Sequence, residues 1–426
     1  MLLDASGRTG PWHGFLAAGV RLSLTIADAS PDAFDRIGAF VGAAEGRCFG
    51  WVGYDQLRGD AMLTLPDQPP TSVGLPVVHW IEPEGVLAFE LGSAPSIEWQ
   101  RRPADGLAEL MESAVLNAAE DDALGPSRSS EPVELATSSL DRPEYLQAFD
   151  RVRNHILRGD IYELNLCREL CGALPGDWTA STAFSRLVQR TSAPYSTWMC
   201  SGGTHVLSAS PECFLEKRGR RLVSRPIKGT APRHARAEQD AMAAELLRTD
   251  PKERAENVMI TDLVRNDLSR IAAPASVEVE ELCGIHSFKN VHQMVSTIAC
   301  DVREGVGFAD ILRATFPMGS MTGAPKIRAM EITAEVEPVR RGLYSGTVGW
   351  ADPDGQGDVG DFHLNVVIRT ILADLESRKW SAHVGGAITA LARPENEWDE
   401  TRLKAEALLE VMGAAERPAP ETLLHD

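Results

Sequence analysis

Residues 141–167 read DRPEYLQAFDRVRNHILRGDIYELNLC and join a helix to a strand. Asp141 and Glu144 form a capping-box pattern, and apolar residues then recur every three or four positions until Gly159. This part predicts a helix that ends before Gly159. Over 162–167 apolar and polar residues alternate instead, which is the period of a half-buried strand.

Further strands are predicted on both sides of this unit. Upstream, short apolar runs around Trp51 and Trp80 are separated by Gly and Pro clusters. Downstream, strands are expected at 196–209, 212–217, 221–225, 343–350, 362–371 and 380–388. Because the strands come in groups between long helices and do not alternate strictly with them, the pattern favours an α+β fold.

The main boundary is expected in the stretch before Asp141. Residues 121–139, DDALGPSRSSEPVELATSS, are acidic and rich in Ser and Pro, which is typical of an exposed connector. We therefore expect a strand-rich region at 1–125 packed on the core, an exposed linker at 126–139 and the main domain at 140–415.

Composition narrows the class of partner. The 426 residues carry 42 Lys and Arg against 61 Asp and Glu, a net charge of −19 that argues against nucleic acid and anionic membranes as partners. An acidic protein that binds an anionic metabolite needs a local reversal of charge, from clustered basic residues or from a divalent cation. The seven cysteines show no CxxC pair, and no signal or membrane-spanning segment is seen, so we expect reduced thiols and a soluble, cytoplasmic protein.

Two predicted helices carry glutamates at the same three-residue spacing. One helix begins at Asp250 and the other at Pro394. The four glutamates are Glu253, Glu256, Glu397 and Glu400. Together they offer four carboxylates to one hard cation such as Mg2+. The alternative is that Glu256 only pairs with Lys252 on a solvated helix face.

Two glycine-rich segments allow close approach of the backbone to an anion. In FPMGSMTGAPK, residues 316–326, glycines precede a helix start with free N–H groups, although a purely structural turn explains the pattern equally well. In VGGAIT, Gly385 and Gly386 follow a predicted strand. Arg369 at another strand end has the geometry for a bidentate carboxylate contact, or for a surface ion pair.

Three more side chains are candidates for chemistry. Lys228, predicted in a turn after a strand, becomes a nucleophile only if its pKa is lowered, and otherwise is an exposed loop lysine. Glu212 lies between strands and is either a general acid with a raised pKa or a rim carboxylate. His292 is predicted on a partly apolar helix face, where a hydrogen-bonded core histidine is the usual case.

Eight motifs in order resemble the chorismate-utilising enzyme family, whose branches include anthranilate, aminodeoxychorismate, isochorismate and salicylate synthases. They are PIKGTAPR, DPKERAENVMITDLVRNDLSR, VHQMVSTI, FPMGSMTGAPKIRAMEI, RGLYSGTVGW, VIRT, VGGAIT and ENEWDET. The resemblance covers roughly residues 140–412. It implies one large fold of two packed, mainly antiparallel β-sheets flanked by helices, with the active site between the sheets.

The resemblance also implies roles for the candidates. The four glutamates would bind Mg2+, which holds the ring carboxylate of chorismate, while Glu212 would protonate the departing C4 hydroxyl and His292 would lie beside the ring. The enolpyruvyl carboxylate would be held by Tyr344, Arg369, Gly385 and Gly386, with Thr322 and Lys404 close by.

Two positions distinguish the branches. Lys228 resembles the aminodeoxychorismate branch, in which the lysine attacks C2 and is displaced when ammonia adds at C4, whereas anthranilate synthases usually have alanine there. Glu163 stands where water-using branches carry a lysine, and Asn165 again resembles the aminodeoxychorismate branch. The alternatives are an enzyme that aminates C2 without using Lys228, and a catalytically silent chorismate-binding subunit.

Ammonia must also be supplied. No stretch resembles a glutamine amidotransferase, so the expected sources are free ammonia or a separate glutaminase subunit.

Overall fold

The computed structural model describes residues 2–4, 13–60, 63–90, 96–100 and 134–417. Of the expected linker, residues 126–133 lie outside these ranges, whereas β8 (Glu134–Ser138) is a strand paired with its neighbours on both sides. In the described ranges, no helix is both long and apolar enough to cross a membrane.

In the residues that the structure describes, the strands form two large sheets, and the first of these has twelve strands. Its path runs through β22 (Ala414–Glu416), β8, β9 (Glu163–Ala173), β21 (Lys379–Thr389), β20 (Thr370–Asp374), β11 (Thr204–Ser210), β10 (Tyr195–Ser201), β1 (Leu2–Asp4), β2 (His13–Ala18), β6 (Gly85–Glu90) and β7 (Ser96–Gln100), with β17 (Gly323–Ala324) beside β9. Apart from the parallel pair of β22 and β8, its described pairs are antiparallel.

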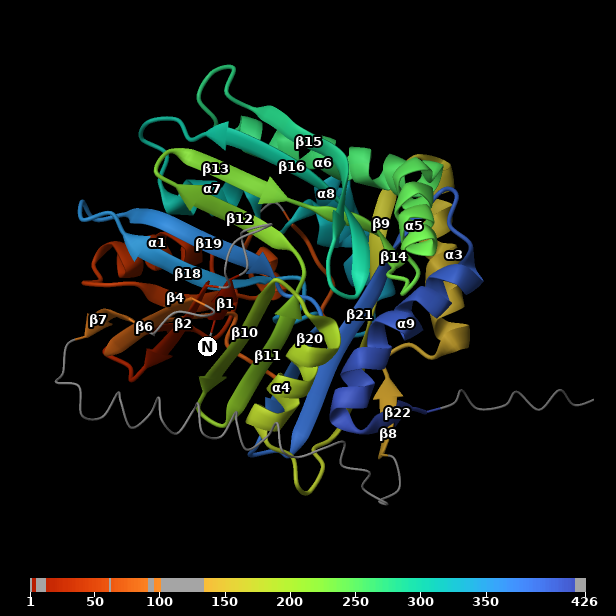
Figure 1. Ribbon diagram of the computed structural model, residues 1–426, viewed down its shortest axis with the longest axis horizontal. Helices are drawn as coiled ribbons and strands as arrows, with labels where there is room; N and C mark the ends of the chain where they lie inside the picture. The colour runs from red at the N-terminus through yellow and green to blue at the C-terminus, as the bar shows by residue number, and fades with distance from the viewer. Residues whose placement is uncertain (1, 5–12, 61–62, 91–95, 101–133, 418–426) are drawn as a thin grey trace, which may run out of the picture.

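The second sheet has ten strands and lies beside the first (Figure 1). Its path runs through β14 (Ile227–Pro232), β16 (Val291–Asp301), β13 (Arg221–Arg225), β12 (Cys213–Arg218), β19 (Val359–Val366), β18 (Thr347–Pro353), β4 (Cys48–Val52), β5 (Val78–Glu82) and β3 (Leu22–Ile26), with β15 (Glu278–Ser287) beside β16. Strands from the first hundred residues therefore complete both sheets.

Helices cover the outer faces of the sheets and confirm the α+β class. They are α1 (Ala33–Gly42), α3 (Arg142–Arg158), α4 (Ala180–Thr191), α5 (Ala237–Thr249), α6 (Pro251–Ser269), α7 (Phe308–Thr315), α8 (Lys326–Val336) and α9 (Pro394–Met412), with 3-10 turns η1 (Tyr54–Gly59) and η2 (Gly319–Met321). The largest apolar core joins α1, α6 and α7 to the second sheet, and another joins α4 and α9 to the first.

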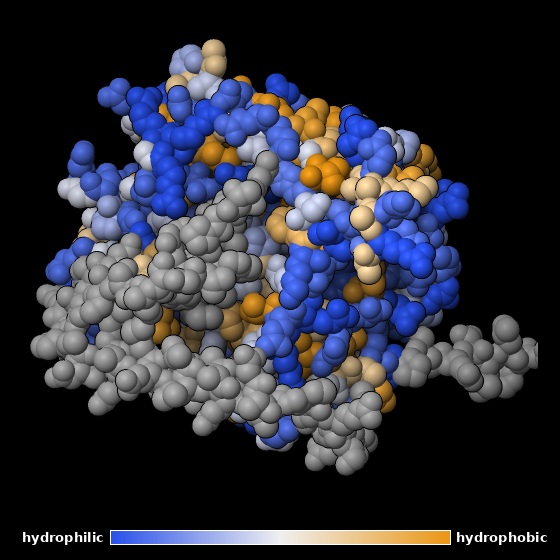
Figure 2. All heavy atoms as spheres, in the orientation of Figure 1, coloured by the Kyte–Doolittle hydropathy of each residue, from blue (hydrophilic) through white to orange (hydrophobic). Residues whose placement is uncertain are grey.

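The surface is largely polar. Figure 2 shows hydrophilic side chains over much of one face, with apolar side chains gathered toward its upper edge, over β15 and α5. Exposed Leu282 and Leu246 belong to these two elements. Scattered exposed apolar residues are normal for a soluble surface, so the polar groups buried inside the molecule are the more informative ones.

Local signals predicted the helix ends well. Asp141 caps α3 by accepting a hydrogen bond from the Glu144 N–H at 2.9 Å, and Gly159 ends the helix with a left-handed φ of 82°. Pro251 and Pro394 open α6 and α9 as expected.

Four strand predictions needed correction. The strand expected at 343–350 begins only at Thr347, because residues 342–345 form a turn. The expected strand at 196–209 is the hairpin of β10 and β11, which turns at Gly202 and Gly203, and the expected strand at 362–371 is split between β19 and β20. β9 is not half-buried: residues 163–170 are all buried, because polar and apolar side chains alike point into the interior. The alternation of polar and apolar residues therefore assigned the side chains of β9 to its two faces correctly. It did not predict that both faces are buried.

The capping box of α3 can be tested directly. Replacing Asp141 by Ala should lower the free energy of unfolding by about 1 kcal/mol, because the N-terminal N–H groups of α3 lose their acceptor. Urea unfolding followed by circular dichroism measures the change. Asp150→Ala, at an exposed position of the same helix, is the control and should leave the midpoint unchanged. Equal losses in both variants would contradict a capping role.

Candidate active site

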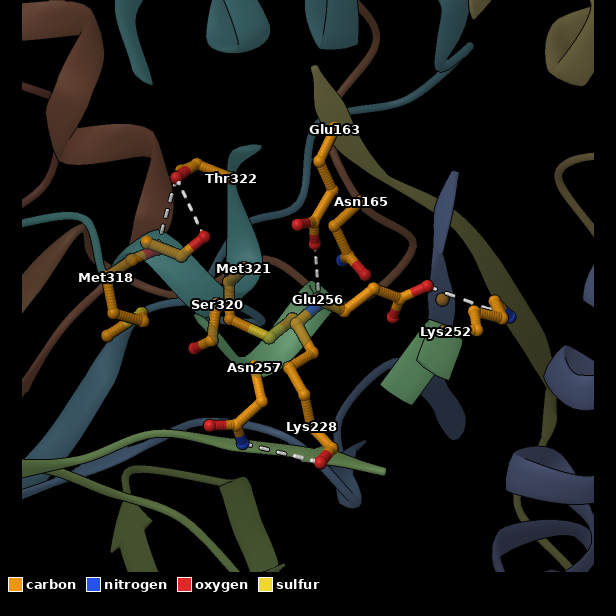
Figure 3. A network of polar contacts seen from close by, with 12 residues as sticks. Glu163, Asn165, Lys228, Lys252, Glu256, Asn257, Met318, Ser320, Met321 and Thr322 are labelled. Atoms are coloured by element: carbon orange, nitrogen blue, oxygen red, sulfur yellow. Dashed lines mark hydrogen bonds and ion pairs between the residues drawn. The ribbon is translucent and has the colours of Figure 1, made fainter. Parts of the chain in front are cut away.

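Helices α6 and α9 bring the predicted glutamates together. Asp250 fixes the start of α6 by accepting from the Glu253 N–H at 2.9 Å. Lys252 then joins the two helices, with its Nζ 3.0 Å from Glu397 Oε1 and 3.7 Å from Glu256 Oε1. Figure 3 shows the contact between Lys252 and Glu256. Glu256 and Glu397 are only 6% and 1% exposed, so the pair of Glu256 with Lys252 lies in the interior and not on a solvated face.

Burial and neighbouring charges shift the pKa values of the glutamate cluster, defined as Glu253, Glu256, Glu397 and Glu400. Burial raises the pKa of Glu256 to about 7, against the pull of Lys228 and Lys252. Burial likewise raises the pKa values of Glu253 and Glu397, and the charge of Glu400 adds to both shifts. At Glu400 burial is outweighed by Lys404, whose Nζ lies 2.6 Å away, and the net pKa shift is downward.

The cluster has the donor chemistry of a site for a hard divalent cation. Glu256 Oε1 and Glu397 Oε2 are buried oxygens without a hydrogen-bond donor, and such atoms are costly unless a cation or water satisfies them. Among the described residues, no three acidic, histidine or cysteine side chains already form a ready-made metal site. The Lys252 ammonium lies between Glu256 and Glu397 and supplies positive charge at this position.

Lys228 lies in strand β14 and not in the turn expected from the sequence, because residues 227–232 pair with β16. Its Nζ donates to Glu163 Oε1 at 2.7 Å, and the two side chains are 11% and 1% exposed. Burial acts to lower the pKa of Lys228, but Glu163 and Glu256 outweigh it and the net shift is upward. Lys228 is therefore an ammonium in this state, and Figure 3 shows it pointing toward Glu163.

Glu212 lies between β11 and β12 at 5% exposure. Ser320 from the glycine-rich segment donates its Oγ–H to Glu212 Oε1 at 2.6 Å. Burial raises the pKa of Glu212 to about 7, although Ser320 and Lys228 oppose the shift. A carboxyl group that titrates there is partly protonated at neutral pH and has the property required of a general acid.

Bare backbone forms the surface beside α9. A Cβ at Gly385 would lie 2.6 Å from Cys167 Sγ, and one at Gly386 would lie 3.4 Å from Glu397 Oε2. Lys404 Nζ donates to the Gly385 carbonyl at 2.7 Å. Gly386 and Lys404 thus border the glutamate cluster, and Lys404 links Gly385 to it.

Arg369, Tyr344 and Thr322 were expected next to these glycines. Arg369 holds a left-handed φ of 52°, and within the described residues its guanidinium has no hydrogen bond or ion pair. A buried guanidinium without such partners is suited to an anionic ligand. Tyr344 stacks on His383 with ring centroids 5.2 Å apart, while buried Thr322 uses its Oγ1 to bond the Met318 carbonyl at 3.2 Å.

His292 departs from its predicted setting. It lies in strand β16 and not on a helix, because residues 291–301 pair along β15. Its Nε2 is 3.0 Å from Asp240 Oδ1 and its Nδ1 is 2.8 Å from Ser287 Oγ. The hydrogen bonds of this ring therefore lead to α5 and β15, and its role beside a substrate ring stays a prediction.

Three residues of the site were not predicted as functional. Glu163 was used only as evidence that a lysine is absent, Lys252 only as the partner of Glu256 on a solvated face, and Ser320 was not singled out. No specific signal marked Glu163, because the same strand also carries buried Asn165, Arg168 and Glu169. The contact of Ser320 with Glu212 joins distant segments and left no local pattern.

Known proteins resemble this chain over most of its length. A family model described as chorismate binding enzyme matches residues 17–410. Aminodeoxychorismate synthase component 1 of Klebsiella aerogenes is 40% identical over 277 residues, 64% of this chain and 58% of the relative, so the match spans little more than half of that protein. Anthranilate synthase component 1 of Streptomyces coelicolor is 34% identical over 88% of this chain and 74% of its own.

A solved structure shares the fold. Anthranilate synthase component I from Streptococcus pneumoniae superposes with a TM-score of 0.75 at 22% identity, covering 93% of this chain and 92% of its own. The likeness supports the arrangement of sheets and helices described above.

The raised pKa of Glu212 has a consequence for stability. Between about pH 4.5 and 7 the Glu212 carboxyl keeps its proton in the folded state but loses it in the unfolded state. Its contribution to the free energy of unfolding therefore falls as the pH rises through that range. From about pH 4.5 to 8, Glu212→Gln should therefore gain on the order of 3 kcal/mol of unfolding free energy relative to the parent protein. Urea unfolding across pH measures the difference.

The control is Glu376→Gln, at an exposed position after β20. Its stability should run parallel to that of the parent protein at every pH. A Glu212→Gln curve that also runs parallel would show that Glu212 titrates normally.

Proposed function

The chain belongs to the chorismate binding enzyme family, and from this premise we propose that it acts as an aminodeoxychorismate synthase component I. In this reaction chorismate and ammonia give 4-amino-4-deoxychorismate and water. The observation that carries the proposal is the placement of Lys228, whose buried amine reaches the interior between Glu163, Glu212 and the glutamate cluster. An amine in that position serves a covalent route to C4 amination.

Mg2+ is the proposed cofactor, held by the glutamate cluster, where it would supply positive charge for the ring carboxylate of chorismate. Support comes from the buried oxygens of Glu256 and Glu397 that lack hydrogen-bond donors. Arg369, Tyr344 and the backbone at Gly385 and Gly386 would hold the enolpyruvyl carboxylate, with Lys404 and Thr322 beside them.

The proposed chemistry assigns opposite tasks to two side chains. Neutral Lys228 attacks C2 of chorismate, the ring double bond shifts, and the C4 hydroxyl leaves as water with a proton from Glu212. Ammonia then adds at C4, the double bond shifts back and Lys228 leaves C2. Hydrogen bonding to Ser320 orients the Glu212 carboxyl, and His292 is proposed to lie beside the ring.

Ammonia is proposed to come from a separate glutaminase subunit. The Klebsiella aerogenes relative is named as component 1, which implies a second component for that protein. A cognate glutaminase that confers no glutamine-dependent turnover would refute this part of the proposal.

Anthranilate synthase activity is the second candidate. The Streptomyces coelicolor relative of that name covers 88% of this chain, more than the 64% covered by the Klebsiella relative. In this case ammonia would add at C2 and Lys228 would not react.

A product assay separates the two candidates. With chorismate, Mg2+ and ammonium, we expect the mass of 4-amino-4-deoxychorismate and no anthranilate fluorescence. Lys228→Ala should slow turnover by about 100-fold or more, because nucleophilic catalysis is lost. Lys289→Ala, at an exposed lysine, should keep full activity. Fluorescent product formed at an undiminished rate by Lys228→Ala would support the anthranilate reaction instead.

The metal site is tested by isothermal titration of Mg2+ into the protein. Glu397→Gln should weaken binding by about tenfold or more, because a buried carboxylate ligand is replaced by a neutral amide. Glu395→Gln is the matched control on α9, since Glu395 is exposed and pairs with Arg142 at the surface. Identical titrations for the two variants would exclude the glutamate cluster as the Mg2+ site.

A further inference from the structure

Lys228 faces carboxylates from several elements. Glu163 on β9 contacts it, and Glu256 on α6 and Glu212 before β12 also favour its charged form. The positive charge of Lys228 in turn acts to lower the pKa values of Glu253 on α6 and Glu400 on α9. An ammonium has no free electron pair, so this resting state cannot attack chorismate. The proposed function therefore requires a group that removes a proton from Nζ.

Glu163 is placed to accept that proton. Its Oε1 is the hydrogen-bond acceptor for Lys228 Nζ at 2.7 Å, which is the path along which a proton moves. Its other oxygen, Oε2, is buried and has no hydrogen-bond partner among the described residues. Within that part of the chain, Lys228 is therefore the hydrogen-bond donor to the Glu163 carboxylate. The strand holds it rigidly, since the Glu163 backbone pairs with Thr389 on one side and Ala324 on the other.

The other carboxylates have different partners. Glu212 accepts from Ser320 and is proposed to give its proton to the leaving hydroxyl. Glu256 faces Lys252, which links it to Glu397 in the glutamate cluster. Within the described residues, Glu163 is the carboxylate within hydrogen-bond distance of Lys228 Nζ.

We propose that Glu163 is a catalytic base that takes the proton of Lys228 when chorismate closes the site, and returns it when the amine is released. The inference rests on the proposed function. The physical basis is the free-energy cost of burying an ion pair away from water. Substrate binding removes the remaining solvent from Lys228 and Glu163. A neutral amine beside a neutral carboxylic acid then becomes more favourable relative to the two buried charges.

The proton balance of the cycle closes. Transfer from Nζ to Glu163 leaves a neutral amine, which forms the bond to C2 while the C4–O bond breaks and Glu212 protonates the departing hydroxyl, which leaves as water. Ammonia forms the C4–N bond, the C2–N bond breaks, and the new C4 ammonium gives a proton back to Glu212. Glu163 finally returns its proton to Lys228. The net change is chorismate plus ammonia to 4-amino-4-deoxychorismate plus water.

The test measures the covalent step alone. Enzyme, Mg2+ and chorismate are mixed without ammonia, quenched at intervals and analysed by intact mass for the adduct on Lys228, from about pH 6 to 8.5. In Glu163→Gln the lysine must lose its proton to solvent. At about pH 7 we expect the Glu163→Gln variant to form the adduct about tenfold more slowly than the parent. This difference in rate should shrink by up to about tenfold for each unit by which the pH rises. Taking the ratio of the two rates cancels the titration of Glu212, which both proteins share.

Two variants complete the experiment. Glu163→Asp keeps a carboxylate, so its rate relative to the parent should be lower but independent of pH. Tyr162→Phe, at the exposed residue before β9, should match the parent. A constant ratio for Glu163→Gln across pH would assign Glu163 a structural role only and overturn the inference. Failure of the proposed function looks different: the parent protein itself would form no adduct.

Discussion

Negative charge concentrated in a buried site is the constraint on which the rest of this structure depends. Six glutamates and three lysines meet where β9 and β14 lie close to α6 and α9: Glu163, Glu212, Glu253, Glu256, Glu397 and Glu400 with Lys228, Lys252 and Lys404. Buried carboxylates are costly unless a cation lies beside them. Because the six carboxylates outnumber the three lysines, the arrangement requires each lysine and favours additional positive charge. An acidic chain can bind an anionic substrate only where that requirement is met.

The fold meets the constraint by placing each group on a different rigid element. α6 and α9 carry the glutamate cluster, β9 carries Glu163, β14 carries Lys228, and the glycine-rich segment carries Ser320. The same segment forms β17 against β9, so the hydrogen-bonded backbone that completes the sheet also places the Ser320 hydroxyl on Glu212. Distances in the site therefore depend on the pairing of strands far apart in sequence.

The sequence predicted those features that have a local physical cause. Capping by Asp141 and Asp250 and the prolines at 251 and 394 located helices within a residue or so, because the signal and the structure involve the same few residues. The paired glutamates followed from helix periodicity. By contrast, the burial of both faces of β9, the strand around Lys228 and the partners of His292 depend on neighbours supplied by distant segments. No local sequence pattern predicts these features. The ion pair of Lys228 with Glu163 likewise joins distant segments and has no local signal.

The sharing of both sheets with the first hundred residues bears on how the chain is made. Trp51 of β4 pairs with Val348 of β18, and Leu3 of β1 pairs with Ser196 of β10. On the ribosome these early strands emerge long before their partners, so one edge of β1 stays unpaired until β10 has been translated, and one edge of β4 until β18 has been translated. Completion of the sheets, and with it assembly of the candidate active site, is thus a late event of biosynthesis.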